Sequence, residues 1–89
     1  MYGVYILKSQ KNNRYYIGST NDVEARLVYH NSGYVAATKN SRPFTLMAYI
    51  LCQNLTEARR SEYLLKRYKR RDITEKVIAD RTFPWLYEK

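Results

Sequence analysis

Glu62 is the residue whose place in the sequence is hardest to explain by packing alone. If the segment around it forms a helix, at about 100° per residue its side chain projects between Leu55 and Ala58, inside the apolar stripe. An ionised carboxylate there is costly unless it is paired or binds a metal. One interpretation is an ion pair with Arg59, Lys66 or an arginine from elsewhere. The other is a ligand of Mg²⁺ or Mn²⁺, ions that prefer oxygen ligands.

Arg26 and His30 form a second unusual pair. In a helix that begins at Val23 they are four residues apart, so they are neighbours at the edge of an apolar stripe that contains Val23 and Leu27. Spacing alone is compatible with an arginine extended along the rim of the core beside a partly buried histidine. The alternative is a pair that faces a functional cleft.

Tyrosine is the third unusual feature, with ten tyrosines in 89 residues. Tyr5 and Tyr16 are expected on adjacent arms of a β-hairpin, where both hydroxyls could reach one site. Most tyrosines on strands simply pack, with the hydroxyl in contact with water. Several polar residues directed at one cleft would be harder to explain in that way.

The first third of the chain has the pattern of a hairpin followed by a helix. Residues 2–8 are apolar and β-prone on both faces, which is typical of a strand covered from both sides. A polar turn leads to a second strand at residues 15–18. Asn21 is expected to cap the following helix, with Glu24 three residues later, and Gly33 to end it.

The remaining elements are one strand and two helices. The nearly continuous apolar run from Phe44 to Cys52 predicts a buried strand. A second capping pattern at residues 54–57 opens a long basic helix that is expected to reach about Arg71. Asp72 is expected to cap a shorter helix that ends at Asp80.

The order ββαβαα predicts an α+β fold, with a three-stranded antiparallel β-sheet flanked by helices. The chain is short enough to form a single domain, residues 1–89. We expect its core to span about residues 2–80. Residues 81–89 are expected to form an aromatic tail, in which Pro84 and Trp85 pack on the surface as a lid.

The charge of the chain favours a polyanionic partner. Sixteen Lys and Arg residues against eight Asp and Glu residues give a net charge of +8, and basic residues gather between Arg59 and Lys76. Such a stretch binds nucleic acid through phosphate contacts and counterion release, although charge does not distinguish DNA from RNA. The residues expected to contact the backbone are Lys66, Arg67, Lys69, Arg70 and Arg71.

Cysteine usage and hydropathy indicate a cytoplasmic protein. Cys52 is the single cysteine, so the chain forms no internal disulfide and has no cysteine cluster for zinc. We expect it to be a buried apolar residue. The sequence shows no cleavable leader, and its apolar runs are far shorter than the roughly 20 residues that cross a bilayer.

The chain resembles the GIY-YIG nuclease superfamily over about residues 2–80. Gly3-Val4-Tyr5 stands where the first triplet of that family belongs, and Tyr16-Ile17-Gly18 matches the second triplet. The best match is the short single-domain branch related to the N-terminal domain of the UvrC excinuclease. Further matching segments are Ser19-Thr20-Asn21-Asp22, Arg26, His30-Asn31-Ser32-Gly33, Thr38 to Leu46, and Glu57-Ala58-Arg59-Arg60-Ser61-Glu62.

This resemblance implies a phosphodiesterase site with one divalent metal, Mg²⁺ or Mn²⁺, bound by Glu62. Tyr5 would be the general base or water-positioning group, and Arg26 would hold the scissile phosphate. Tyr16 and His30 would orient water or phosphate through hydrogen bonds, with His30 able to share proton transfer. A phenol has an ordinary pKa near 10, so Tyr5 would need a nearby cation to act as a base.

Two departures from the family pattern bear on function. Ser61 stands where many relatives of this branch have arginine, which predicts the loss of one phosphate contact. Active members also commonly carry a separate DNA-recognition domain, and we expect none in this chain.

The sequence therefore supports a metal-dependent DNA endonuclease of low sequence specificity, and we expect it to act in DNA repair or recombination. We expect a monomer whose targeting to DNA depends on a protein partner. The alternative is a non-catalytic or partner-dependent nucleic-acid-binding module that keeps the nuclease fold. A basic ribosome-associated protein is a third interpretation of the charge and the tyrosines.

Overall fold

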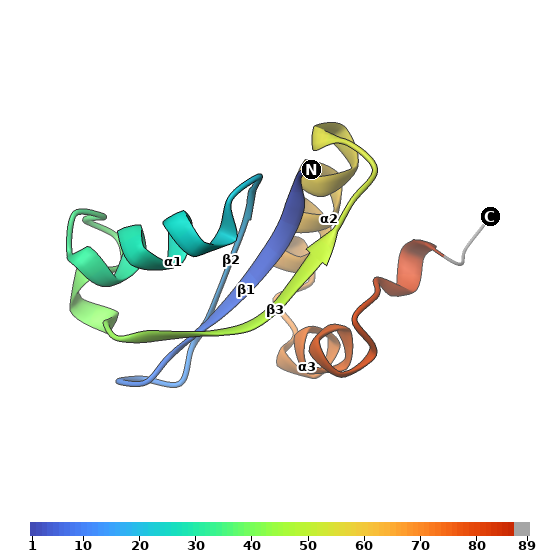
Figure 1. Ribbon diagram of the computed structural model, residues 1–89. Helices are drawn as coiled ribbons and strands as arrows, with labels where there is room; N and C mark the ends of the chain where they lie inside the picture. Colours follow the sequence, from blue (N-terminus) through green and yellow to red (C-terminus); the bar gives the residue numbers. More distant parts are fainter. Residues whose placement is uncertain (87–89) are drawn as a thin grey trace.

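A computed structural model describes residues 1–86, and its elements follow the predicted ββαβαα order (Figure 1). The fold is α+β, as expected from the sequence. The last three residues of the expected aromatic tail lie outside the described residues. The strands are β1 (Gly3–Ser9), β2 (Tyr15–Thr20) and β3 (Phe44–Leu51), the α-helices are α1 (Val23–Ser32), α2 (Leu55–Tyr68) and α3 (Arg71–Asp80), and the 3-10 helices are η1 (Lys39–Ser41) and η2 (Pro84–Leu86).

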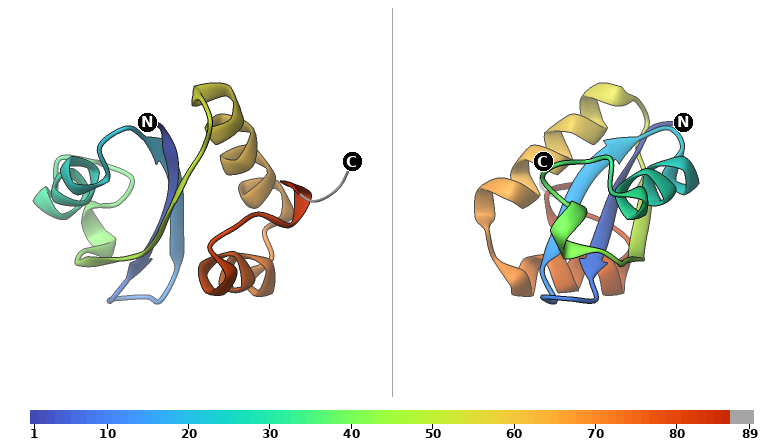
Figure 2. Two further views of the ribbon diagram at one scale, coloured as in Figure 1. Left: turned by 45° about the vertical axis from the view of Figure 1, so that its right-hand side comes forward. Right: turned by 90° about the vertical axis from the view of Figure 1, so that its left-hand side faces the viewer.

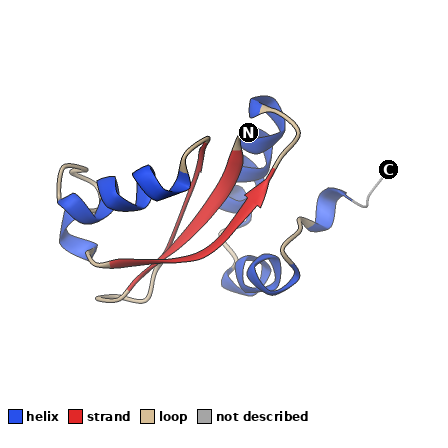
Figure 3. Ribbon diagram, in the orientation of Figure 1, coloured by secondary structure: helices blue, strands red, loops and turns tan. Residues whose placement is uncertain are grey.

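The three strands form one antiparallel sheet in the order β2-β1-β3 (Figure 3). The central strand β1 is almost wholly buried, which confirms the expectation for residues 2–8. The expectation that Phe44 to Cys52 is a buried strand was wrong in part, because β3 lies at an edge and Leu51 is exposed. An apolar run does not distinguish a central strand from an edge strand that packs on helices.

Helices cover both faces of the sheet (Figure 2). Helix α1 packs on one face, over a small core that contains Tyr5, Leu7 and Phe44. Helices α2 and α3 pack on the other face over a larger core. The buried residues of the larger core are Val4, Ile6, Ala48, Ile50, Cys52, Ala58, Leu65, Val77 and Phe83.

The larger core extends beyond α3 into the C-terminal segment. Phe83 is fully buried, and Trp85 stacks on it at 5.1 Å between ring centroids. The Trp85 indole N–H donates a hydrogen bond of 3.1 Å to Ser61 Oγ on α2. Trp85 thus covers the junction of α2 and the tail while remaining partly exposed.

Of the first three helix ends predicted from the sequence, two are correct and one is displaced. Asn54 accepts a hydrogen bond of 2.8 Å from the Glu57 amide, so it caps α2 as expected. Gly33 ends α1 in the left-handed conformation that favours glycine. The cap of α1 is Asp22 rather than Asn21, because the Asp22 carboxylate accepts from the Ala25 amide at 3.1 Å.

The long basic helix is shorter than predicted. Helix α2 ends at Tyr68, since Lys69 adopts a left-handed conformation with φ of 49°. Helix α3 begins at Arg71, so Arg70 occupies the capping position that was predicted for Asp72. Asp72 lies in the first turn, where it pairs with Arg70 at 2.6 Å. The basic residues that were expected on one helix are therefore divided between two helices and the turn that joins them.

Candidate active site

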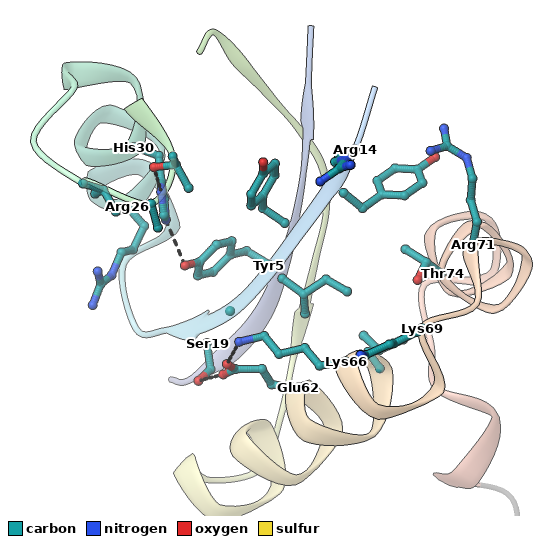
Figure 4. Close-up of a pocket in the computed structure, with 18 of the residues that line it drawn as sticks. Tyr5, Arg14, Ser19, Arg26, His30, Glu62, Lys66, Lys69, Arg71 and Thr74 are labelled. Carbon is teal, nitrogen blue, oxygen red and sulfur yellow. Dashed lines mark hydrogen bonds and ion pairs between the residues drawn. The ribbon is translucent and has the colours of Figure 1, made fainter. Parts of the chain in front are cut away.

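The five residues predicted to act on the substrate line one cleft of about 920 Å³ (Figure 4). The cleft lies along the free edge of β2, and we call it the edge cleft. Side chains reach it from both faces of the sheet, because β2 has no neighbouring strand on that side. The five residues are Tyr5 of β1, Tyr16 of β2, Arg26 and His30 of α1, and Glu62 of α2.

Gly18 leaves the space in which the Tyr5 ring lies. Tyr5 and Gly18 are opposite each other in the β1–β2 register, and the phenol lies directly over the glycine. A Cβ at position 18 would be 2.2 Å from the Tyr5 hydroxyl oxygen and 2.4 Å from the ring carbon that bears it. The glycine is therefore required by the path of the phenol across the strand rather than by an unusual backbone angle.

The Tyr5 hydroxyl is joined to two other buried groups. Tyr5 Oη lies 3.1 Å from His30 Nε2, and His30 Nδ1 lies 3.1 Å from Thr38 Oγ1. The three residues are 7%, 8% and 4% exposed, respectively. Thr38 stands in the loop before η1, and sequence reasoning did not single out its side chain.

Burial controls the protonation of this pair. It raises the pKa of Tyr5 above 10.0, an effect that the positive charge of Arg26 opposes and the negative charge of Glu62 reinforces. Burial also lowers the pKa of His30 below 6.5, and Arg26 lowers it further. Near pH 7 the imidazole is consequently neutral and the phenol keeps its proton. Arg26 alone does not make Tyr5 the low-pKa base that the family resemblance implies.

Both interpretations of Glu62 have a counterpart in the structure. One carboxylate oxygen accepts a hydrogen bond of 2.7 Å from Ser19 Oγ, and the other pairs with Lys66 Nζ at 2.6 Å. The Glu62 side chain is nevertheless 22% exposed and lines the edge cleft. It lies beside the buried stripe of α2 rather than within it, which lowers the cost of its charge.

The groups around Glu62 suit a hard divalent cation that is shared with a substrate. Within residues 1–86 no three His, Cys, Asp or Glu side chains gather at one point, so a cation here would have Glu62 as its charged ligand. Mg²⁺ keeps several waters and is commonly held by one or two carboxylates together with substrate phosphates. The partner Lys66 is 55% exposed, so it can leave the carboxylate at little cost.

Arg26 presents a guanidinium that is available to a substrate. It is exposed, lines the edge cleft, and lies over the Tyr29 ring at 5.8 Å from the centroid. Among the described residues, no carboxylate lies within ion-pair distance of it. Tyr16 differs in this respect, because its hydroxyl already meets Ser41 Oγ at 3.0 Å.

Four of the five predicted nucleic-acid contacts also border the edge cleft. They are Lys66, Lys69, Arg70 and Arg71. Arg14 also lines the cleft, and sequence reasoning missed it because it lies beside the hairpin turn, away from the basic stretch of residues 59–76. Arg67 does not line the cleft and donates to the Tyr63 hydroxyl at 2.9 Å.

Arg71 also has a structural role. Its guanidinium lies 4.5 Å from the centroid of the Tyr15 ring and donates to the Asn13 carbonyl at 2.7 Å. It also pairs with Glu75 at 3.5 Å. These contacts hold the hairpin turn against the start of α3, and so fix one end of the edge cleft.

Ser61 does not have the position that was inferred for it. Its side chain is 1% exposed, faces the larger core and accepts a hydrogen bond from Trp85. The interpretation that serine here removes a phosphate contact was therefore wrong, because the side chain points away from the edge cleft. Ser61 was linked to the cleft because it is next to Glu62 in the sequence. Neighbouring residues on a helix project in different directions, so Ser61 does not face the cleft that Glu62 lines.

None of the helices within residues 1–86 combines the length and the apolar character that a membrane crossing requires.

The chain is similar to known proteins over most of its length. Residues 1–76 match the family model described as the GIY-YIG catalytic domain. A UPF0213 protein of Staphylococcus haemolyticus is 42% identical over 79 residues, which cover 88% of this chain and 94% of that protein. A UPF0213 protein of Clostridium perfringens is 33% identical over 87 residues, covering 97% and 92%. The solution structure of a UPF0213 protein of Bacillus halodurans superposes with a TM-score of 0.55 at 29% identity, covering 96% and 90%.

Proposed function

The chain belongs to the GIY-YIG catalytic domain family, and on that premise we propose that it is a divalent-metal-dependent endonuclease that hydrolyses DNA with low sequence specificity. The observation that carries the proposal is the meeting of a phenol, an imidazole, a guanidinium and a carboxylate from separate elements in one basic cleft. The proposal includes a cytoplasmic protein that acts in DNA repair or recombination. The single thiol of Cys52, which is buried and free, is compatible with a reducing compartment.

Arg26 binds the scissile phosphate in this mechanism. Its guanidinium is exposed at the mouth of the cleft and has a fixed fork of donors that matches two phosphate oxygens. It remains charged throughout the reaction and stabilises the additional negative charge of the transition state. Removing such a group costs about 10²- to 10³-fold in kcat.

Tyr5 and His30 position the attacking water. The phenol lies on the α1 side of β2, and its hydroxyl is held by His30 at 3.1 Å. Because burial keeps His30 neutral, the imidazole acts on Tyr5 as a hydrogen-bonding group and does not contribute a positive charge. Tyr16, fixed by Ser41, closes the same side of the cleft.

Glu62 holds the cation on the α2 side of β2. Bound Mg²⁺ or Mn²⁺ would polarise the phosphate and stabilise the charge that develops on the leaving oxygen. Ser19 keeps one carboxylate oxygen oriented, since it donates at 2.7 Å. With a cation on Glu62, Lys66 would be free to contact a neighbouring phosphate.

The basic border of the cleft holds the DNA backbone. Arg14, Lys66, Lys69, Arg70 and Arg71 supply contacts that position a duplex but read little sequence. One chain supplies every proposed site residue, so the proposal is a monomeric enzyme that a protein partner directs to its target. Binding should weaken steeply between about 50 and 200 mM salt.

A supercoiled-plasmid nicking assay with Mg²⁺ or Mn²⁺ tests the proposal. The variants Glu62→Gln and Arg26→Ala should each lose at least about 100-fold in rate while keeping the parental circular dichroism spectrum. Arg60→Ala is the matched control for charge, since Arg60 is exposed on α2 and does not line the cleft. Parental rates for both site variants would exclude the assigned mechanism.

One observation favours a second candidate, a nucleic-acid-binding module that cleaves only with a partner or not at all. Both oxygens of Glu62 are engaged, by Ser19 and Lys66, and burial raises the pKa of Tyr5. In that case DNA binding would be salt-dependent, and the chain alone would not nick plasmid with either metal. Titration of branched, nicked and duplex DNA with and without metal separates the two functions.

A further inference from the structure

The side chain of Thr38 has a single hydrogen-bonding partner among the described residues. Thr38 occupies the capping position of η1, but its hydroxyl makes no capping hydrogen bond there. It turns instead to His30 Nδ1 at 3.1 Å, and the threonine is only 4% exposed. A hydroxyl that gives up a local cap to reach an imidazole is an unusual use of threonine at a helix start.

We propose that Thr38 is a positioning residue that holds His30 as the tautomer with its proton on Nε2. Thr38 Oγ donates to Nδ1, which therefore carries no hydrogen, and Nε2–H then donates to the hydroxyl oxygen of Tyr5. The hydrogen of the Tyr5 hydroxyl is left free to point into the edge cleft. The effect of this tautomer on catalysis rests on the proposed nuclease function, whereas the tautomer itself does not.

Hydrogen-bond accounting distinguishes this arrangement from its opposite. With the proton on Nδ1, His30 would donate to Thr38, and the threonine hydroxyl would have no acceptor within residues 1–86. A buried donor without a partner is costly. With the proton on Nε2 the Thr38 hydroxyl is paired with His30, and only the hydrogen of Tyr5 has to find water or substrate in the cleft; Thr38 borders the cleft too, but it is the less exposed of the two residues, at 4% against 7%.

The surroundings also fix which way the ring faces. The ring of His30 lies near the rings of Tyr5, Tyr29 and Phe44, at 5.8, 6.4 and 6.0 Å between centroids. Turning the imidazole by 180° would put carbon atoms against both hydroxyls and break both hydrogen bonds. The ring is therefore held in one orientation, and its tautomer is the remaining variable.

This tautomer assists Tyr5 in the role proposed for it. A donated hydrogen bond from Nε2–H favours the deprotonated phenol, as does the positive charge of Arg26, and both oppose the effect of burial. The opposite tautomer would make Tyr5 the donor to His30, which favours the neutral phenol and directs its hydrogen away from the cleft. Thr38 thus acts on the reaction through its hydrogen bond to His30.

Nuclear magnetic resonance of the ¹⁵N-labelled protein measures the tautomer directly. His30 is the sole histidine of the chain, so its ring signals need no assignment strategy. At about pH 8, where the imidazole is neutral, we expect Nε2 to be the protonated nitrogen in the parent protein. Thr38→Ser, which keeps the hydroxyl, should give the same pattern. Thr38→Asp, whose ionised carboxylate can only accept a hydrogen bond, should move the proton to Nδ1.

The nicking assay then tests the consequence. Thr38→Val should lower kcat about tenfold and leave KM unchanged, and Thr38→Ser should restore kcat to within about twofold of the parent. A parent protein with the proton on Nδ1, or a tautomer unaffected by Thr38→Asp, would overturn the proposal. If Thr38→Asp does not fold, the parent and Thr38→Ser spectra still decide it. A parental Nε2–H signal without any cleavage would instead count against the nuclease function alone.

Discussion

The contact between Tyr5 and Gly18 leads to a prediction in which one substitution changes the sign of another. In Gly18→Ala the new Cβ would lie 2.2, 2.4 and 2.7 Å from three atoms of the Tyr5 phenol. All three atoms lie at or beyond the outer part of the ring, which leucine does not have. In the Tyr5→Leu background the same Cβ would therefore meet none of them.

The magnitude follows from how firmly the phenol is held. Tyr5 is 7% exposed and bound to His30, so it cannot turn aside without losing that hydrogen bond. Overpacking of about 1–3 kcal/mol and one lost hydrogen bond of about 1 kcal/mol give a loss of about 2–4 kcal/mol in the free energy of unfolding. Gly18 has an ordinary strand backbone, so alanine itself is slightly favourable there. In the Tyr5→Leu background Gly18→Ala should be neutral, or stabilising by up to about 0.5 kcal/mol.

Urea denaturation followed by Trp85 fluorescence measures this double-mutant cycle. Trp85 is the single tryptophan and lies in the core on the opposite face of the sheet from Tyr5. Gly33→Ala is the matched control, because Gly33 has a φ of 89° and alanine there should be destabilising in both backgrounds. An equal loss from Gly18→Ala in both backgrounds would refute the reasoning, since the backbone and not the phenol would then require glycine.

Three further predictions concern other parts of the molecule. Lys66→Met should tighten Mn²⁺ binding about two- to fivefold in calorimetry, because the exposed lysine no longer competes with the cation for the Glu62 carboxylate. An unchanged affinity would show that Lys66 does not occupy the place of the cation. Ser61→Arg should lower the free energy of unfolding by about 3 kcal/mol or more, since it puts a charge into a site that is 1% exposed beneath Trp85, whereas Ser61→Ala should cost only about 1 kcal/mol; an unchanged melting temperature would mean that the tail leaves the core easily. Folding lowers the pKa of His30, so as the pH falls below about 6.5 the unfolded chain takes up a proton before the folded chain does. The contribution of His30 to the free energy of unfolding is therefore complete above about pH 6.5 and is lost progressively below it. Denaturation curves at several pH values should show this slope in the parent and lack it in His30→Gln.

The sequence predicted the elements well because their signals are local. The capping asparagine of α2, the glycine that ends α1 and the doubly apolar β1 each depend on a few adjacent residues. The end of α2 was predicted wrongly because no local signal marks it. Lys69 has no intrinsic preference for a left-handed conformation, and neither glycine nor proline marks the turn between the two helices.

The candidate site was predicted only as far as its residue types. The family triplets and the ordered residues after them identified the residues that now line one cleft, although their roles stay a prediction. The partners of these residues were not predictable, because Ser19, Thr38 and Ser41 are separated from them in sequence and were placed by the fold. The ion pair of Glu62 with Lys66 was among the alternatives predicted from the sequence, because the two residues are one helical turn apart.

The division of the site between the two faces of the sheet explains why it lies at β2. Tyr5 and His30 belong to the small core under α1, and Glu62 lies beside the larger core under α2. A continuous sheet would separate the two groups, and they can meet only where a strand has no neighbour. Gly18 lets the phenol reach that edge across β2, and Ser19, the next residue, holds the carboxylate there from the opposite face. Adjacent residues of a strand point to opposite faces, so two consecutive positions of β2 are sufficient to bring both halves of the site to one edge.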